Sequence, residues 1–116
     1  MNENTKLIFI CSPFRGRAKE TVKRNIHRAR KYCRLAAMRG DIPFAPHLLY
    51  TQFLDDGTES ERNLGITMGL NMLAHCQEMW VFGVPTSGMA REIAVAKDLK
   101  IPIRWFDVKA RPVQHE

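Results

Sequence analysis

One carboxylate stands out by its surroundings in the segment "PTSGMAREIAVAKDLKIPI" near the end of the chain. The segment is typical of the end of a loop, a helix and the start of a strand. On that helix, the residues three and four positions before and after Glu92 carry no charge. A carboxylate held among apolar groups can stabilise a developing positive charge or attack an electrophilic carbon.

A structural explanation of Glu92 remains open beside the chemical one. Ser87 is a plausible N-cap of the helix, but Ala90 occupies the position from which a glutamate would complete a capping box. Glu92 is therefore not placed for capping. A carboxylate one turn into a helix still gains from the positive helix N-terminus, so Glu92 can also be a residue that only stabilises its helix.

The elements that must position this residue follow an alternating pattern. Short apolar runs bounded by turn residues predict strands over residues 6–12, 41–46, 78–83 and 101–106. Helical periodicity predicts helices over residues 19–39 and 60–75 and a third within the segment that carries Glu92. The connection "HLLYTQFLDDGTESER" receives no predicted conformation.

Alternating strands and helices predict a three-layer α/β fold of the Rossmann or flavodoxin-like type. We expect a parallel sheet of about four to five strands with helices on both faces. At 116 residues the chain is long enough for one domain. Residues 1–107 are predicted to form it, and 108–116 to be a frayed C-terminal tail because they lack apolar periodicity.

In such folds, ligands bind at the carboxyl ends of the strands. That edge gathers three loops of this sequence: "SPFRG" after the first strand, "PHLLYTQFLDD" after the second and "GVPTSGM" after the third. We expect the functional site where these loops meet.

The formal net charge of +6 lies largely in the first predicted helix. Its basic residues fall mainly outside the apolar stripe, which favours a solvated helix face over a nucleic-acid-binding surface. No nucleic-acid-binding signature accompanies the charge.

Cysteine spacing and hydropathy limit the class of protein further. Cys11, Cys33 and Cys76 are widely spaced, which excludes a disulfide framework and a zinc motif and favours small buried side chains. No run of about 20 apolar residues is present, and we expect a cytoplasmic protein. No metal or cofactor is expected, because no set of side chains supplies a defined metal shell.

The segment containing Glu92 resembles the signature of the nucleoside 2-deoxyribosyltransferase superfamily. Its loop of small residues, its glycine opening a helix and its "PI" strand all match. "IFICSPFRG" resembles the first strand and loop of that superfamily, which includes the 2'-deoxynucleoside 5'-phosphate N-hydrolases. "SPFRG", "IPFAPHLLYTQFLDD", "ER" and "WVFG" are similar to an uncharacterised bacterial and phage domain family grouped with those enzymes.

The resemblance implies a role for Glu92 at C1' of a nucleoside sugar, as nucleophile or as the group that assists water. The enzymes also carry an aspartate in the helix before the third strand, which acts on the departing base. Here that region reads "GITMGLNMLAHC", and Gly69 or a neighbour stands where the aspartate is expected. Asp55 and Asp56 are candidate substitutes, and the alternative for both is an ordinary turn with Gly57.

The resemblance also implies a phosphate-binding role for Arg15, whose alternative is a surface salt bridge. Backbone N–H groups at the start of the third helix supply a second candidate anion site, formed by Ser87, Gly88 and Met89. Ser12 and Gly16 belong to the same loop as Arg15. Ser12 matches imperfectly, because Pro13 stands where the N-hydrolases have a serine, and one glycine is no nucleotide fingerprint.

Several other residues are candidate walls of the pocket. Phe14 and Tyr50, with Phe53, are candidates for stacking on a base, with plain packing as the alternative. His47 is a candidate substrate-binding residue, with structural hydrogen bonding as the alternative. Asn25 reaches toward the sugar or ties down a loop.

Two classes of function therefore remain. The first is hydrolysis or transfer at the N-glycosidic bond of a nucleoside or nucleoside 5'-monophosphate, and the second is non-catalytic binding of a nucleotide or nucleotide-derived signal. A nucleic-acid-binding protein is a distant third. The resemblance further implies a homodimer or higher homo-oligomer and no membrane partner.

Overall fold

Four short parallel strands form the sheet in the described part of the protein. The computed structural model describes residues 4–16 and 18–114. The strands are β1 (Leu7–Cys11), β2 (Ile42–Phe44), β3 (Glu78–Phe82) and β4 (Ile103–Phe106). They lie in the order β2-β1-β3-β4, and each neighbouring pair is parallel. The predicted flavodoxin-like sheet is confirmed.

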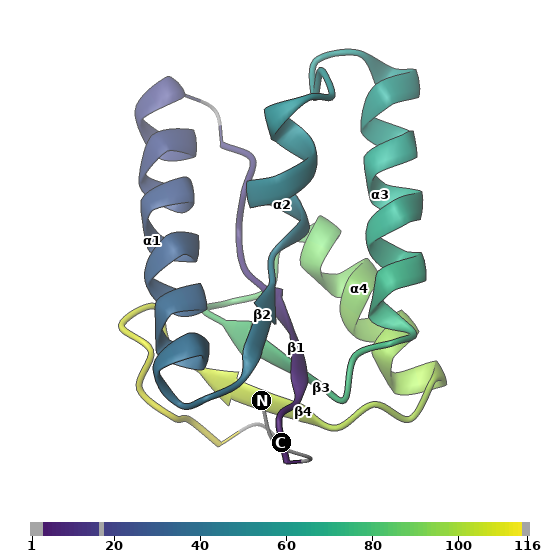
Figure 1. Ribbon diagram of the computed structural model, residues 1–116. Coiled ribbons are helices and arrows are strands. Elements are labelled where there is room, and N and C mark those ends of the chain that lie inside the picture. The colour runs from purple at the N-terminus through teal and green to yellow at the C-terminus, as the bar shows by residue number, and fades with distance from the viewer. Residues whose placement is uncertain (1–3, 17, 115–116) are drawn as a thin grey trace.

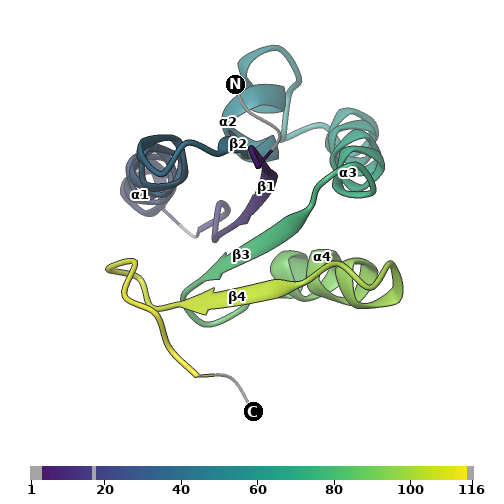
Figure 2. The ribbon, with the colours of Figure 1, turned by 60° about the horizontal axis from the view of Figure 1, so that its bottom comes forward.

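Helices cover both faces of this sheet, as predicted. Helix α1 (Lys19–Met38) lies on one face, and α3 (Glu59–Leu73) and α4 (Ser87–Asp98) lie on the other (Figure 2). A short helix α2 (Pro46–Leu49) and a 3-10 turn η1 (Tyr50–Gln52) follow β2, in the connection whose conformation the sequence left open. Within the described residues, no helix combines the length and apolarity needed to cross a membrane.

The central strands are apolar throughout because both of their faces are covered. On β1, Ile8 and Ile10 pack with α1, whereas Phe9 and Cys11 pack with α3 and α4. Their exposed fractions are 2% or less, so neither face of the strand meets solvent. Alternation of side chains between two buried faces therefore explains the continuous apolar pattern.

Aromatic rings fill the layer between the sheet and α1. The ring of Phe82 stacks on Tyr32 with centroids 3.9 Å apart and on Phe106 at 4.8 Å. Trp80 on β3 is 1% exposed and belongs to the same core. The guanidinium groups of Arg39 and Arg104 each lie 5.3 Å from its ring centroid and shield it from solvent.

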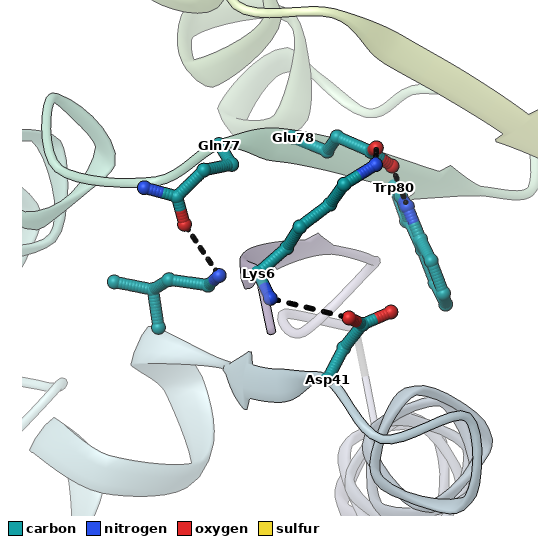
Figure 3. Close-up of polar contacts among 6 residues, drawn as sticks. Lys6, Asp41, Gln77, Glu78 and Trp80 are labelled. Atoms are coloured by element: carbon teal, nitrogen blue, oxygen red, sulfur yellow. Dashed lines mark hydrogen bonds and ion pairs between the residues drawn. The ribbon is translucent and has the colours of Figure 1, made fainter. Parts of the chain in front are cut away.

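A polar cluster ties together the amino ends of the strands (Figure 3). The Lys6 ammonium contacts the Glu78 carboxylate at 2.6 Å, and the same carboxylate accepts a hydrogen bond from the indole N–H of Trp80 at 2.9 Å. The Lys6 backbone N–H donates to Asp41 at 3.2 Å. These contacts hold the amino ends of β1 and β3 and the start of β2 to one another.

Residues after β4 form a hydrogen-bonded turn in place of the frayed tail that was expected over residues 108–116. The Asp107 carboxylate accepts from the Arg111 backbone N–H at 3.0 Å and from its side chain at 2.8 Å. The Val113 N–H then donates to the carbonyl of Trp105. Polar side chains therefore order this segment, although it has no apolar periodicity. The last two residues of the chain lie outside the described part.

The burial of Leu73 gives a test of this core. Leu73 is fully buried at the end of α3, so Leu73→Ala should lower the free energy of unfolding by about 2–5 kcal/mol. Leu64 lies on the same helix but is 49% exposed, and Leu64→Ala should change it by about 0.5 kcal/mol or less. Urea unfolding at neutral pH measures both. Equal losses in the two variants would contradict this packing.

Candidate active site

The connection after β2 places its residues at the carboxyl edge of the sheet. Helix α2 begins at Pro46, whose fixed φ suits the first helical turn, and η1 follows without a break. Figure 1 shows α2 between α1 and α3 at this edge. The connection therefore forms the roof of the predicted site.

A cleft opens where the three loops meet, as expected for this fold. Its volume is about 410 Å³, within the range of small-molecule sites. Nine of the thirteen residues predicted from the sequence line it, and these are Ser12, Phe14, Arg15, His47, Asp56, Ser87, Gly88, Met89 and Glu92.

Five further residues line the cleft, and no role was predicted for them. They are Arg62, Asn63, Ile66, Thr86 and Arg91. A side pocket of about 50 Å³ adjoins the cleft and shares Glu92, His47, Asp56 and Arg62 with it. Within the described residues, the Arg62 guanidinium forms no ion pair. In the sequence, Arg62 was marked only as part of the short motif "ER", which is similar to the uncharacterised domain family.

Glu92 lies in the wall shared by the cleft and the side pocket. Its Oε1 accepts a hydrogen bond from the Cys11 thiol, with 3.4 Å between sulfur and oxygen. Burial raises the pKa of Glu92 to about 7, although the Cys11 hydrogen bond and the charge of Arg91 act in the opposite direction. Near neutral pH both protonation states of this carboxyl group are therefore populated.

Thr86, not Ser87, caps the helix that carries Glu92. The Thr86 hydroxyl oxygen accepts from the Met89 backbone N–H at 3.3 Å, and Ser87 is the first residue of α4. The prediction of Ser87 as N-cap is wrong by one position, because threonine and serine are adjacent and both can cap. Glu92 lies beyond the first turn and takes no part in the cap.

Cys11 is the second partner in the Glu92 contact, and the sequence treated it only as a small apolar residue. It is fully buried at the end of β1. Burial raises the pKa of its thiol well above the usual value, and the charge and hydrogen bond of Glu92 raise it further. The thiol therefore stays protonated and donates. All three cysteines are free, and Cys33 is only partly buried.

The two adjacent aspartates have different positions. Asp56 lines the cleft and contacts Arg15, with 3.5 Å between Oδ2 and Nε. Asp55 instead accepts hydrogen bonds from the Thr58 hydroxyl at 2.7 Å and the Gly57 N–H at 2.9 Å, which lower its pKa. Asp55 is thus the turn residue of the stated alternative, and Asp56 alone faces the cleft.

Three other residues predicted to bind substrate do not line the cleft. Asn25 donates to the Phe14 carbonyl at 3.0 Å and so ties down the loop, as its alternative stated. A Cβ on Gly16 would lie 2.3 Å from a carbon of Thr21, so Gly16 permits close packing of the loop on α1. Tyr50 lines the side pocket.

His47 and Phe14 form one aromatic wall of the cleft. Their rings stack with centroids 4.7 Å apart and 12° between planes. Burial lowers the pKa of His47, against the charge of Asp56, which raises it. The imidazole is therefore neutral at pH 7, where it offers one hydrogen-bond donor and one acceptor.

Helix α3 lines the side pocket with Glu61 near its start but has no acid near Gly69, where the aspartate was expected. Gly69 is buried there, and a Cβ at this position would lie 3.3 Å from the Pro46 Cβ. The close approach of α2 thus leaves little room for a larger side chain. Among the described residues, no group of three or more His, Cys, Asp or Glu side chains is placed to hold a metal ion.

Solved structures with the same architecture define the class of fold. A 2-deoxyribosyltransferase from Bacillus psychrosaccharolyticus matches with a TM-score of 0.65 and 19% identity over 93% of this chain and 77% of its own. A 2-desoxiribosyltransferase from Leishmania mexicana matches with a TM-score of 0.58 and 20% identity, over 88% of this chain and 64% of its own. The protein has the nucleoside 2-deoxyribosyltransferase-like fold.

Within that fold, the chain belongs to the family described as a domain of unknown function, DUF7768, whose model matches residues 6–106. No curated protein sequence matches the chain.

The raised pKa of Glu92 predicts a dependence of stability on pH. The folded-state pKa of about 7 lies above the ordinary value of 4.5, so the folded protein binds this proton more tightly than the unfolded chain. The free energy of unfolding should therefore fall as pH rises from about 4.5 to about 7. Glu92→Gln should remove this loss, which amounts to about 2 kcal/mol after allowance for partial exposure.

Urea unfolding of both proteins between pH 4 and pH 8 tests this, since the gain in the variant should appear only toward the upper end. Asp98→Asn removes an exposed carboxylate from the same helix and should leave the pH dependence of the wild type in place. A gain from Glu92→Gln that is equal at pH 4 and pH 8 would contradict the assignment.

The Cys11 hydrogen bond predicts a second change. Cys11→Ala removes the donor to the ionised carboxylate, so the pKa of Glu92 should rise above its wild-type value of about 7. Cys11→Ser keeps a donor and should raise it less. The titration of glutamate side-chain ¹³C resonances, assigned to Glu92 with Glu92→Gln, measures the shift. An unchanged Glu92 titration in Cys11→Ala would exclude the hydrogen bond.

Proposed function

We propose that the cleft binds a nucleoside or nucleoside 5'-monophosphate and that the protein hydrolyses or transfers its N-glycosidic bond. The observation that carries the proposal is Glu92, a carboxylate with a pKa of about 7 in the wall of a cleft at the carboxyl edge of the sheet. Its place in a nucleoside 2-deoxyribosyltransferase-like fold supports the choice of reaction.

The reaction requires a carboxylate on the face of the sugar opposite the base. As the bond between C1' and the base nitrogen breaks, its electron pair leaves with the base and positive charge develops on the sugar ring. Ionised Glu92 stabilises that charge and forms an ester bond to C1', or directs a water to it. The developing cation also favours the ionised form of Glu92, against the effect of burial.

The departing base must receive a proton or a hydrogen bond. Asp56 is the second carboxylate of the cleft, and we assign it this role. Its contact with Arg15 places it at the cleft rim, since the two side chains are 33% and 64% exposed. Neutral His47 is available as a hydrogen-bonding partner on the same side.

The cationic groups of the cleft favour a substrate that carries a phosphate. Arg15 and Arg62 both line it, together with the N–H groups at the start of α4. Arg62 has no anionic partner among the described residues, so a phosphate can pair with it without displacing a carboxylate. We therefore propose a nucleoside 5'-monophosphate ahead of a free nucleoside.

A second candidate function is binding of such a nucleotide without catalysis. The observation in its favour is the absence of an acid on α3 near Gly69, where Pro46 limits the space for one. The same cationic groups would hold the ligand in either case. Association into a homo-oligomer stays a prediction, and a partner chain that completed the cleft would weigh against this candidate.

Base release distinguishes the two functions. The protein should liberate free base from at least one member of a panel of deoxynucleosides, ribonucleosides and their 5'-monophosphates. Glu92→Gln should lower the rate by about 10³-fold or more, since it removes the group that attacks C1'. Asp98→Asn, on the same helix but exposed, should retain it. Chromatography of the free base gives the rates.

Thermal shift with the same panel gives the alternative outcome. A nucleotide that raises the melting temperature without being cleaved, with the shift lost in Arg62→Ala, would replace the enzyme proposal by the binding proposal. Neither cleavage nor a shift with any panel member would reject both.

A further inference from the structure

The exposed face of α1 carries a line of positive charge. Lys19, Lys23, His27, Arg30 and Arg34 follow one another at intervals of three or four residues, and all are exposed. On a helix this spacing places them on one side. The buried residues of α1 include Ala29, Tyr32 and Ala36, which lie on the opposite side. We call these five exposed residues the basic stripe.

The charge is concentrated in this helix. Helix α1 contains seven lysines and arginines and one glutamate, a net of +6, which equals the formal net charge of the whole chain. The remainder of the chain is thus balanced. A net charge that only kept the protein soluble would not need to lie on a single helix.

The basic stripe does not stabilise the fold by the usual means. Among the described residues, none of its side chains forms an ion pair. Cations favour the C-terminal end of a helix, yet the last turn of α1 has none and Lys19 lies in its first turn. Like charges at this spacing also repel one another. An external anionic partner is the interaction that would offset these costs.

The shape of the stripe selects the partner. It extends over about 22 Å, since fifteen residues of a helix rise 1.5 Å each. The one exposed large apolar side chain of α1 is Met38, four residues after Arg34, and a single such side chain is too little to insert a helix face into a membrane. Figures 1 and 2 show α1 at one side of the molecule with no element beyond it. A long, unobstructed line with four lysine and arginine side chains matches a chain of phosphates.

We infer that the basic stripe of α1 binds the phosphate backbone of a nucleic acid. The contact is electrostatic and independent of base sequence, because contacts to phosphates position a protein on a nucleic acid without reading its bases. This surface is separate from the cleft and does not depend on the proposed reaction. This assignment departs from the solvated face that the sequence favoured.

The test compares two variants of equal net charge. Lys23→Gln/Arg30→Gln/Arg34→Gln neutralises three charges of the stripe. Lys97→Gln/Lys100→Gln/Lys109→Gln neutralises three exposed lysines outside α1. Fluorescence anisotropy with a labelled 20-base-pair DNA duplex and a 20-nucleotide single strand, at several salt concentrations, gives the affinities. Circular dichroism melting verifies that both variants fold.

The wild type should bind with a dissociation constant of about 10⁻⁴ to 10⁻⁶ M at physiological salt. The stripe variant should lose at least about tenfold in affinity, and its slope of log K against log salt should fall by about two to three. The control variant should lose about twofold or less. The stripe variant should release free base at the same rate as the wild type.

Three results would overturn the inference. Equal losses in both variants would show a response to net charge alone. Absence of binding by the wild type at about 50 mM salt would remove the surface altogether. Polyglutamate that displaced the duplex at lower charge concentration than DNA itself would assign the stripe to an acidic protein.

Discussion

The hydrogen bond between the Cys11 thiol and the Glu92 carboxylate joins the core of the protein to its cleft. Cys11 is the last residue of β1 and is fully buried, and Glu92 lies in the second turn of α4. The contact requires β1 and β3 to pair in register and α4 to be capped by Thr86, so that the helix begins at Ser87. The hydrogen bond fixes the position of one oxygen of the Glu92 carboxylate. Burial of the same group favours its protonated form, so the packing around Glu92 determines both its orientation and its pKa.

The two edges of the sheet divide their tasks. At the amino edge, charged groups pair with one another, as Lys6 does with Glu78. At the carboxyl edge, Arg62 has no partner among the described residues and Glu92 has only a thiol. Charges that are satisfied within the protein stabilise it, whereas partly satisfied charges are available to a ligand. The two edges of the sheet thus differ in how far their charged groups are paired within the protein.

The sequence predicts the sheet from its apolar runs and α1 and α4 from clear helical periodicity, whereas this periodicity is weak in α3. It also places most residues of the cleft, since the carboxyl ends of parallel strands converge whatever the loops do. It does not predict α2, because the four residues Pro46–Leu49 are too few for a periodic pattern. Without α2, the sequence offers no basis for separating Asp56 from Asp55 or for the loss of space at Gly69.

Long-range contacts account for the other differences. Cys11 and Glu92 are 81 residues apart, and no local pattern marks a buried cysteine as a donor to a distant carboxylate. Arg62 is a second example, because its proposed role depends on the absence of an ion-pair partner among the described residues. Local signals can identify a residue as buried or exposed, but a partner or its absence is a property of the folded chain.

Positive charge has two different settings in this protein. Arg15 in the cleft is paired with Asp56, so an anion that binds to Arg15 must share it with this carboxylate or replace the carboxylate. That competition favours a ligand with additional contacts, such as a base or sugar, over a bare phosphate. The cations of the basic stripe face no such competition and select only for charge. A nucleotide that contacts Arg15 thus competes with Asp56, whereas a polyanion on the basic stripe displaces no acid of the described residues.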